Sequence, residues 1–110
     1  MADPLRVVIA DDNYLVREGT RRLLEDSGDV LVLASVSNAA ELLQAVEDLR
    51  PDAVLTDIRM PPGHSTEGIE AAHAIRARHP RIGAVVLPQH SDAAYAPDLL
   101  QNAPAGAGDL

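Results

Sequence analysis

Apolar residues along the chain form short, nearly continuous runs separated by longer amphipathic stretches. The runs cover residues 5–10, 30–36, 53–56 and 82–87. Apolar runs of this length, with few polar residues inside each run, are typical of strands buried on both faces of a parallel sheet. The sequence therefore predicts four such strands.

The stretches between these runs place apolar residues at helical spacing. Helices are predicted over residues 13–27, from residue 38 to Pro51, and over residues 65–79. Asn38 followed by Glu41 is a capping-box pattern that opens the second helix. Its inner face is expected to carry Leu42, Leu43, Val46 and Leu49.

Alternating strands and helices with continuous apolar strands favour an α/β fold. Right-handed crossovers leave few topologies, and we predict a flavodoxin-like, doubly wound parallel sheet with strand order 2-1-3-4-5. A helix is expected over residues 92–102, either kinked at Pro97 or starting late, near Pro97, and a weak, glycine-containing fifth strand is expected over residues 105–110. The expected unit is a single domain over residues 1–110, incomplete after the fifth strand and lacking the final helix.

Composition narrows the classes of function. The 110 residues, 46% of them hydrophobic, suit one core. Nine basic against 17 acidic residues give a net charge of -8, which opposes binding to nucleic acid and to anionic membranes. The absence of cysteine excludes disulfides and zinc-thiolate sites, and no apolar stretch suggests a signal peptide or a membrane span. We expect a cytoplasmic domain.

Three aspartates follow two of the predicted strands. Asp11 and Asp12 come directly after the first, and Asp57 follows the third. Because the carboxyl ends of parallel strands meet in one crevice, these carboxylates are expected to share a site that attracts Mg²⁺. The alternative is that they are solvated strand-end groups that cap helices or form turns, since Asp12 followed by Asn13 also suits a helix start.

The phrase Asp57-Ile58-Arg59-Met60-Pro61-Pro62, with Gly68 opening the next helix and the two aspartates after the first strand, resembles a response-regulator receiver domain. Residues 85–90 and the segment with Tyr95 are similar to receivers of the NarL/LuxR-type subfamily, which precede DNA-binding output domains in two-component systems. The resemblance extends over essentially the whole chain.

What this resemblance implies is a phosphoacceptor aspartate at Asp57 and a partner sensor histidine kinase. Mg²⁺ would be held by Asp12 and Asp57, with Asp11 acting through the water shell of the metal or positioning it, and Arg59 contributing its backbone carbonyl. The output DNA-binding domain is not present in this chain. The domain would not be an enzyme beyond autophosphatase activity.

The chain also departs from the family. At the switch position where the family carries Ser or Thr it has Pro88, at the aromatic position of the fifth strand it has Asp109, and it contains no lysine. Proline has neither a hydroxyl nor an N–H to offer a phosphoryl group. The chain is therefore either a degenerate receiver or a truncated one. An uncovered apolar sheet face would also favour a homodimer.

Two other functions stay open. A degenerate, phosphorylation-independent receiver would act as a dimerisation or ligand- or protein-interaction module. A small Mg²⁺-dependent phosphatase would use Asp57 as its nucleophile. The spacing of His64, His73, His79 and His90 matches no common metal-ligand pattern, so surface or helix-packing roles are expected for them.

Overall fold

A computed structural model of the chain describes residues 3–88. Strands and helices alternate along this part, in the predicted order: β1 (Leu5–Ala10), α1 (Tyr14–Asp26), β2 (Val30–Val36), α2 (Ala39–Leu49), β3 (Ala53–Asp57), α3 (Glu67–Arg78) and β4 (Gly83–Leu87). The helix expected over residues 92–102 and the strand expected over 105–110 lie outside the described residues.

The four described strands form one parallel sheet with the order β2-β1-β3-β4. β1 pairs with β3 in a register that sets Ala10 beside Thr56, and β3 pairs with β4 so that Asp57 lies beside Leu87. The two strands that end in aspartates are therefore immediate neighbours. This confirms the predicted flavodoxin-like topology for strands one to four.

Side-chain caps begin the first two helices. The Asn13 side chain accepts a hydrogen bond from the N–H of Val16 at 3.1 Å, and that of Asn38 accepts one from the N–H of Glu41 at 2.8 Å. The Glu41 carboxylate bonds back to the N–H of Ser37 at 3.0 Å rather than to that of the cap itself. The predicted cap is thus confirmed, with its return bond one residue earlier. No helix within residues 3–88 combines the length and apolar character needed to cross a membrane.

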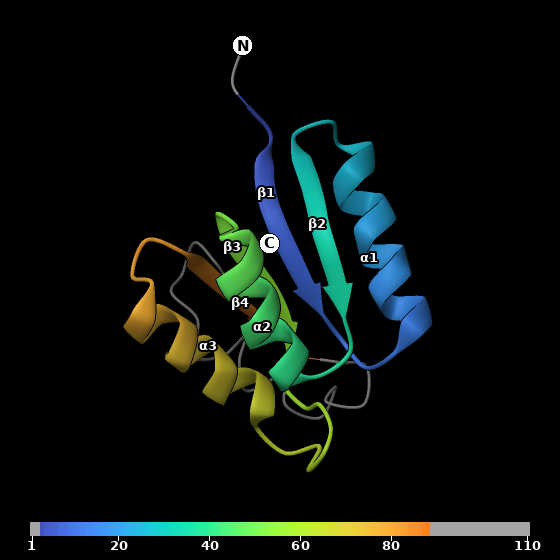
Figure 1. Cartoon of the computed structure of the whole chain (residues 1–110). Coiled ribbons are helices and arrows are strands. Elements are labelled where there is room, and N and C mark those ends of the chain that lie inside the picture. The colour runs from blue at the N-terminus through green and yellow to red at the C-terminus, as the bar shows by residue number, and fades with distance from the viewer. Residues whose placement is uncertain (1–2, 89–110) are drawn as a thin grey trace, which may run out of the picture.

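The core lies between the sheet and the pair α2 and α3, which pack together over one face (Figure 1). Its fully buried side chains are Val8, Leu42, Val46, Val54, Thr56, Met60 and Ile75. The predicted inner face of α2 was wrong in part. Leu43 and Leu49 are 38% and 36% exposed, and Ala45 is buried in their place, because the face of α2 toward α3 and the sheet is Leu42, Ala45 and Val46.

α1 lies apart from α2 and α3, beside β2, and packs over the opposite face of the sheet (Figure 1). None of its residues is fully buried, and its Leu15 and Leu23 are 80% and 76% exposed. Val85 and Leu87 of β4 are about half exposed. Within residues 3–88, apolar side chains of α1 and β4 are therefore exposed.

Candidate acidic site at the carboxyl ends of β1 and β3

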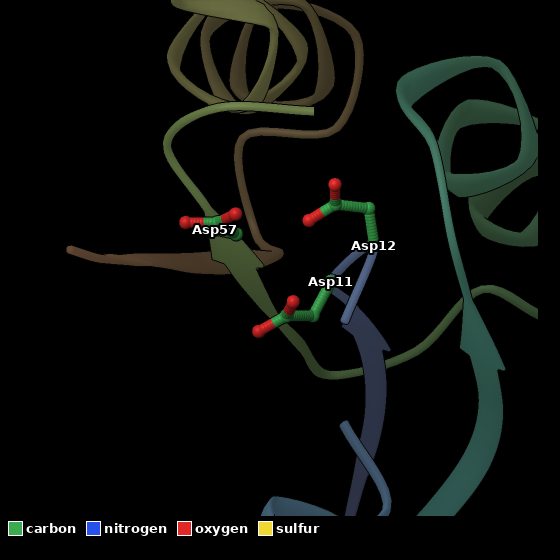
Figure 2. A group of neighbouring side chains, drawn as sticks. All are labelled: Asp11, Asp12 and Asp57. Carbon is green, nitrogen blue, oxygen red and sulfur yellow. The ribbon is translucent and has the colours of Figure 1, made fainter. Parts of the chain in front are cut away.

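The three aspartates that the sequence predicts to converge lie together. Asp57 is the last residue of β3, and Asp11 and Asp12 follow β1 on the neighbouring strand (Figure 2). One carboxylate oxygen from each lies within 4.8 Å of the others. The parallel pairing of β1 with β3 produces this arrangement, because equivalent ends of the two strands meet at the same edge.

Burial disfavours the charged form of the Asp57 carboxylate when no cation is nearby. Asp57 is 3% exposed and Asp11 is 8% exposed, while Asp12 is only partly buried. Neither carboxylate oxygen of Asp57 has a hydrogen-bond partner in the described structure. A buried carboxylate without partners carries a large desolvation penalty, and in a folded protein such a group calls for a proton or a cation.

The pKa of Asp57 reflects this environment. Burial, which is the largest cause, and the negative charges of Asp11 and, to a smaller extent, Asp12 together raise it from 3.8 to about 7. The backbone N–H groups of Ile58 and Arg59 oppose the rise, although neither forms a well-aligned hydrogen bond with the carboxylate. Asp57 is therefore poised between its neutral and charged forms near neutral pH.

Backbone contacts fix the two sides of the site. The Asp11 carboxylate accepts a hydrogen bond from the N–H of Asn13 at 2.8 Å, and the Arg17 guanidinium donates to the Asp11 carbonyl at 2.8 Å. On the other side, the N–H of Gly68 donates to the Ile58 carbonyl at 2.8 Å.

Gly68 brings the first turn of α3 directly against the end of β3. A Cβ atom at this position would overlap the backbone carbonyl of Asp57. Only glycine allows this close approach of helix and strand. The glycine in the sequence phrase therefore positions the backbone that carries Asp57.

The remaining residues predicted for the site have different outcomes. Arg59 lies two residues beyond Asp57, in the loop that leaves β3. Pro88 follows β4, is exposed, and lines with Asp11 and Asp57 a hollow of ≈ 90 Å³ on the α1 face of the sheet. It brings no hydroxyl to that hollow. Asp109 lies outside the described residues.

One neighbour of the site was missed from the sequence. His64 Nε2 lies 3.1 Å from Asp12 Oδ2. Its side chain is 55% exposed, so the expected surface position is correct, but its contact with the acidic site was not foreseen. His79 packs between helices as expected, 3.2 Å from Glu47 of α2, and His73 is exposed on α3. His90 lies outside the described residues.

The donor set fits a hard divalent cation. The three converging side chains offer only oxygen atoms, which Mg²⁺ prefers, and their charges repel one another unless a proton or cation intervenes. Mg²⁺ usually binds through one or two carboxylates and keeps several waters, so a site this small and partly open suits it. The unpartnered oxygens of Asp57 are the structural observation that supports this fit.

Comparison with known proteins gives a consistent result. The response regulator receiver domain family matches residues 7–108. The chain is 32% identical to the transcriptional regulatory protein DegU of Brevibacillus brevis, over 93% of this chain and 42% of that protein. It is 33% identical to the oxygen regulatory protein NreC of Staphylococcus aureus, over 93% of this chain and 46% of that protein. The chain thus spans less than half the length of these relatives.

Solved structures show the same similarity. The signal receiver domain of the putative response regulator NarL from Mycobacterium tuberculosis superimposes with a TM-score of 0.73 at 32% identity, covering 91% of this chain and 78% of that one. A two-component response regulator of the LuxR family from Aurantimonas gives a TM-score of 0.72 at 30% identity, covering 90% and 69%.

Proposed function

Because the chain belongs to the response regulator receiver domain family, we propose that Asp57 accepts a phosphoryl group from a sensor histidine kinase in a Mg²⁺-dependent reaction. One observation supports this above all others. The Asp57 carboxylate is buried and unpartnered beside two more carboxylates, which suits a nucleophile that works with a cation.

The proposed reaction transfers the phosphoryl group between two side chains. A carboxylate oxygen of Asp57 attacks the phosphorus of the kinase phosphohistidine, an O–P bond forms, and the N–P bond breaks. The released imidazole nitrogen regains its electron pair and takes a proton from solvent. Bound Mg²⁺ would offset the repulsion between the anionic nucleophile and the anionic phosphoryl group.

The residues around Asp57 would hold the cation that the reaction needs. Asp12 and Asp57 would hold the cation directly, and the Arg59 backbone carbonyl would be a further oxygen ligand. Asp11 would act through the water shell of the cation or would position it. Asp57 must be charged to attack. Its pKa of about 7 leaves much of it protonated at neutral pH without a cation, so metal binding and nucleophile activation are coupled. Apart from losing its own phosphoryl group, the domain would catalyse no reaction.

In the whole protein, this domain would control a DNA-binding output domain. A transcriptional regulatory protein among the relatives and their greater length support that arrangement. Pro88 limits the coupling, because it offers no hydroxyl through which the phosphorylated and unphosphorylated states could differ. We therefore expect phosphorylation to shift the conformation of this domain little.

A second candidate function rests on the same proline and on the α1 face. A receiver whose switch position is Pro88 could act as a phosphorylation-independent interaction module. The exposed apolar residues of its α1 face are Val16, Leu23, Val85 and Leu87. A patch of this kind favours self-association.

We propose a homodimer through this face. Light scattering at high concentration should show the dimer, and Leu23→Arg should dissociate it. Leu43→Arg, at a less exposed position on α2, is the matched control and should leave the dimer intact. A monomeric wild-type protein would exclude this proposal.

The decisive experiment is incubation with a small acyl phosphate or phosphoramidate and Mg²⁺, followed by intact-mass measurement. A mass gain of one phosphoryl group is expected for the wild type, none for Asp57→Asn, and an unchanged gain for Asp48→Asn, at an exposed position of α2. If no adduct forms while circular dichroism shows a folded domain, the interaction module becomes the better account.

A further inference from the structure

The loop between β3 and α3 holds a histidine over the acidic site. His64 and Asp12 are 52 residues apart in sequence, yet Nε2 of one lies 3.1 Å from Oδ2 of the other. The backbone of His64 has φ of 51°, in the left-handed region that residues other than glycine seldom adopt. A strained conformation of this kind persists only when the surrounding contacts hold it in place.

The contacts that hold it come mainly from Glu67, in the first turn of α3. Its carboxylate accepts hydrogen bonds from the N–H of Gly63 at 2.8 Å and from the N–H of Ser65 at 2.7 Å. The N–H of His64 itself donates to the Met60 carbonyl at 2.9 Å. The residues on both sides of His64 are therefore fastened to one carboxylate, an arrangement called here the Glu67 clamp.

Two further observations show how closely the Glu67 clamp fits. The backbone N–H groups of Ser65 and Gly63 lower the pKa of Glu67, Ser65 having the larger effect, so the carboxylate stays charged and able to accept both bonds. A Cβ atom on Gly63 would collide with Glu67 Oε2. A larger residue at 63 would therefore displace the Glu67 carboxylate that holds the loop.

The imidazole lies outside the ligand group itself. The oxygens that lie within 4.8 Å of one another come from the three aspartates, and His64 is not among this group. Its contact is with Asp12, the most exposed of the three, whose side chain is 28% exposed and so has the most room to turn toward solvent. A hydrogen bond from outside the ligand group restricts that rotation.

We propose that His64 is a positioning residue, which donates its Nε2–H to Asp12 Oδ2 and so sets the affinity of the acidic site for a divalent cation. The inference rests on the proposed function, since it needs a cation at the three aspartates. Losing a hydrogen-bond partner of a metal-ligating side chain typically weakens metal binding about ten- to hundredfold. The Glu67 clamp would act on the cation only through His64.

The test is Mg²⁺ affinity, measured by isothermal titration calorimetry and by amide shifts in NMR. His64→Gly removes the ring without strain, because glycine adopts φ of 51° readily. It should bind Mg²⁺ about ten- to hundredfold more weakly. His64→Gln keeps an N–H donor on a side chain of similar reach and should recover most of the loss. His73→Gln, at an exposed position on α3, is the matched control and should change nothing.

A double-mutant cycle tests whether Glu67 affects Mg²⁺ binding through His64. Glu67→Gln should weaken Mg²⁺ binding in the wild-type background and add nothing in the His64→Gly background. Unchanged affinity in His64→Gly, or a Gln variant no better than the Gly variant, would overturn the inference while leaving the proposed function intact. If the wild type binds no Mg²⁺ and gains no phosphoryl mass, the proposed function fails and the inference fails with it.

Discussion

Removing the charge of Asp57 should stabilise the metal-free protein at alkaline pH. The wild-type carboxylate is 3% exposed, has no hydrogen-bond partner for either oxygen in the described structure, and lies beside Asp11 and Asp12. Folding therefore transfers a charge from water to a site that disfavours it. Asp57→Asn keeps the shape of the side chain and removes this electrostatic cost.

The magnitude follows from the pKa. The folded state raises the pKa of Asp57 from 3.8 to about 7, so it binds the proton more tightly than the unfolded state does. The resulting stabilisation is fully present below the unfolded pKa and is lost as pH rises through about 7. At pH 8 the charged carboxylate costs at most about 4 kcal/mol. The buried amide of Asn costs about 1–3 kcal/mol, which leaves a net gain of about 1–3 kcal/mol.

The assay is urea unfolding in EDTA followed by far-ultraviolet circular dichroism, since the chain has no tryptophan. The advantage of Asn over Asp should shrink by about 2–3 kcal/mol between pH 8 and pH 5. Asp48→Asn removes the same charge from an exposed position of α2 and controls for the net charge of -8. If Asp57→Asn is no more stable than the wild type at pH 8, or if its advantage is the same at both pH values, the account of the site is wrong.

Other measurements test separate parts of the structure. Apparent Mg²⁺ affinity should rise about tenfold between pH 6 and pH 8, as deprotonation of Asp57 with its pKa of about 7 is completed, and calorimetry at several pH values measures this. Gly68→Ala should destabilise the protein by about 1–3 kcal/mol or more in urea unfolding, because its Cβ overlaps the Asp57 carbonyl. Gly19→Ala, in open space on α1, should instead stabilise it by about 0.5–1 kcal/mol. Asn38→Ala should cost about 1 kcal/mol by removing the cap on the Glu41 N–H.

Strand positions were predictable because all four strands are short, nearly continuous apolar runs in the sequence. Continuous apolar runs marked the strands within a residue at most boundaries, and the strand-end aspartates followed from them. The buried face of α2 was predicted less well. Periodicity identifies apolar residues, but the position of α3 decides which of them are covered, and so Ala45 is buried while Leu43 is partly exposed.

The contact of His64 with Asp12 could not be predicted in the same way. It depends on a loop conformation with positive φ and on two backbone hydrogen bonds to Glu67, none of which follows from hydrophobic spacing. The available signal was local. A glutamate three residues after the histidine supplies the carboxylate that accepts both bonds, and a glycine directly before the histidine leaves room for it.

The acidic site and the switch position of this receiver lie on different parts of the sheet. The acidic site is built from β1 and β3, the central strands of the described sheet. The Arg17 guanidinium of α1 donates to the Asp11 carbonyl, and the N–H of Gly68 in α3 donates to the Ile58 carbonyl. The switch position, Pro88, directly follows β4 on the other side of β3, and it is exposed. A residue there can therefore lack a hydroxyl without disturbing the three carboxylates. For this reason we expect phosphorylation of Asp57 and a conformational response to be separable, with Pro88→Ser strengthening only the response.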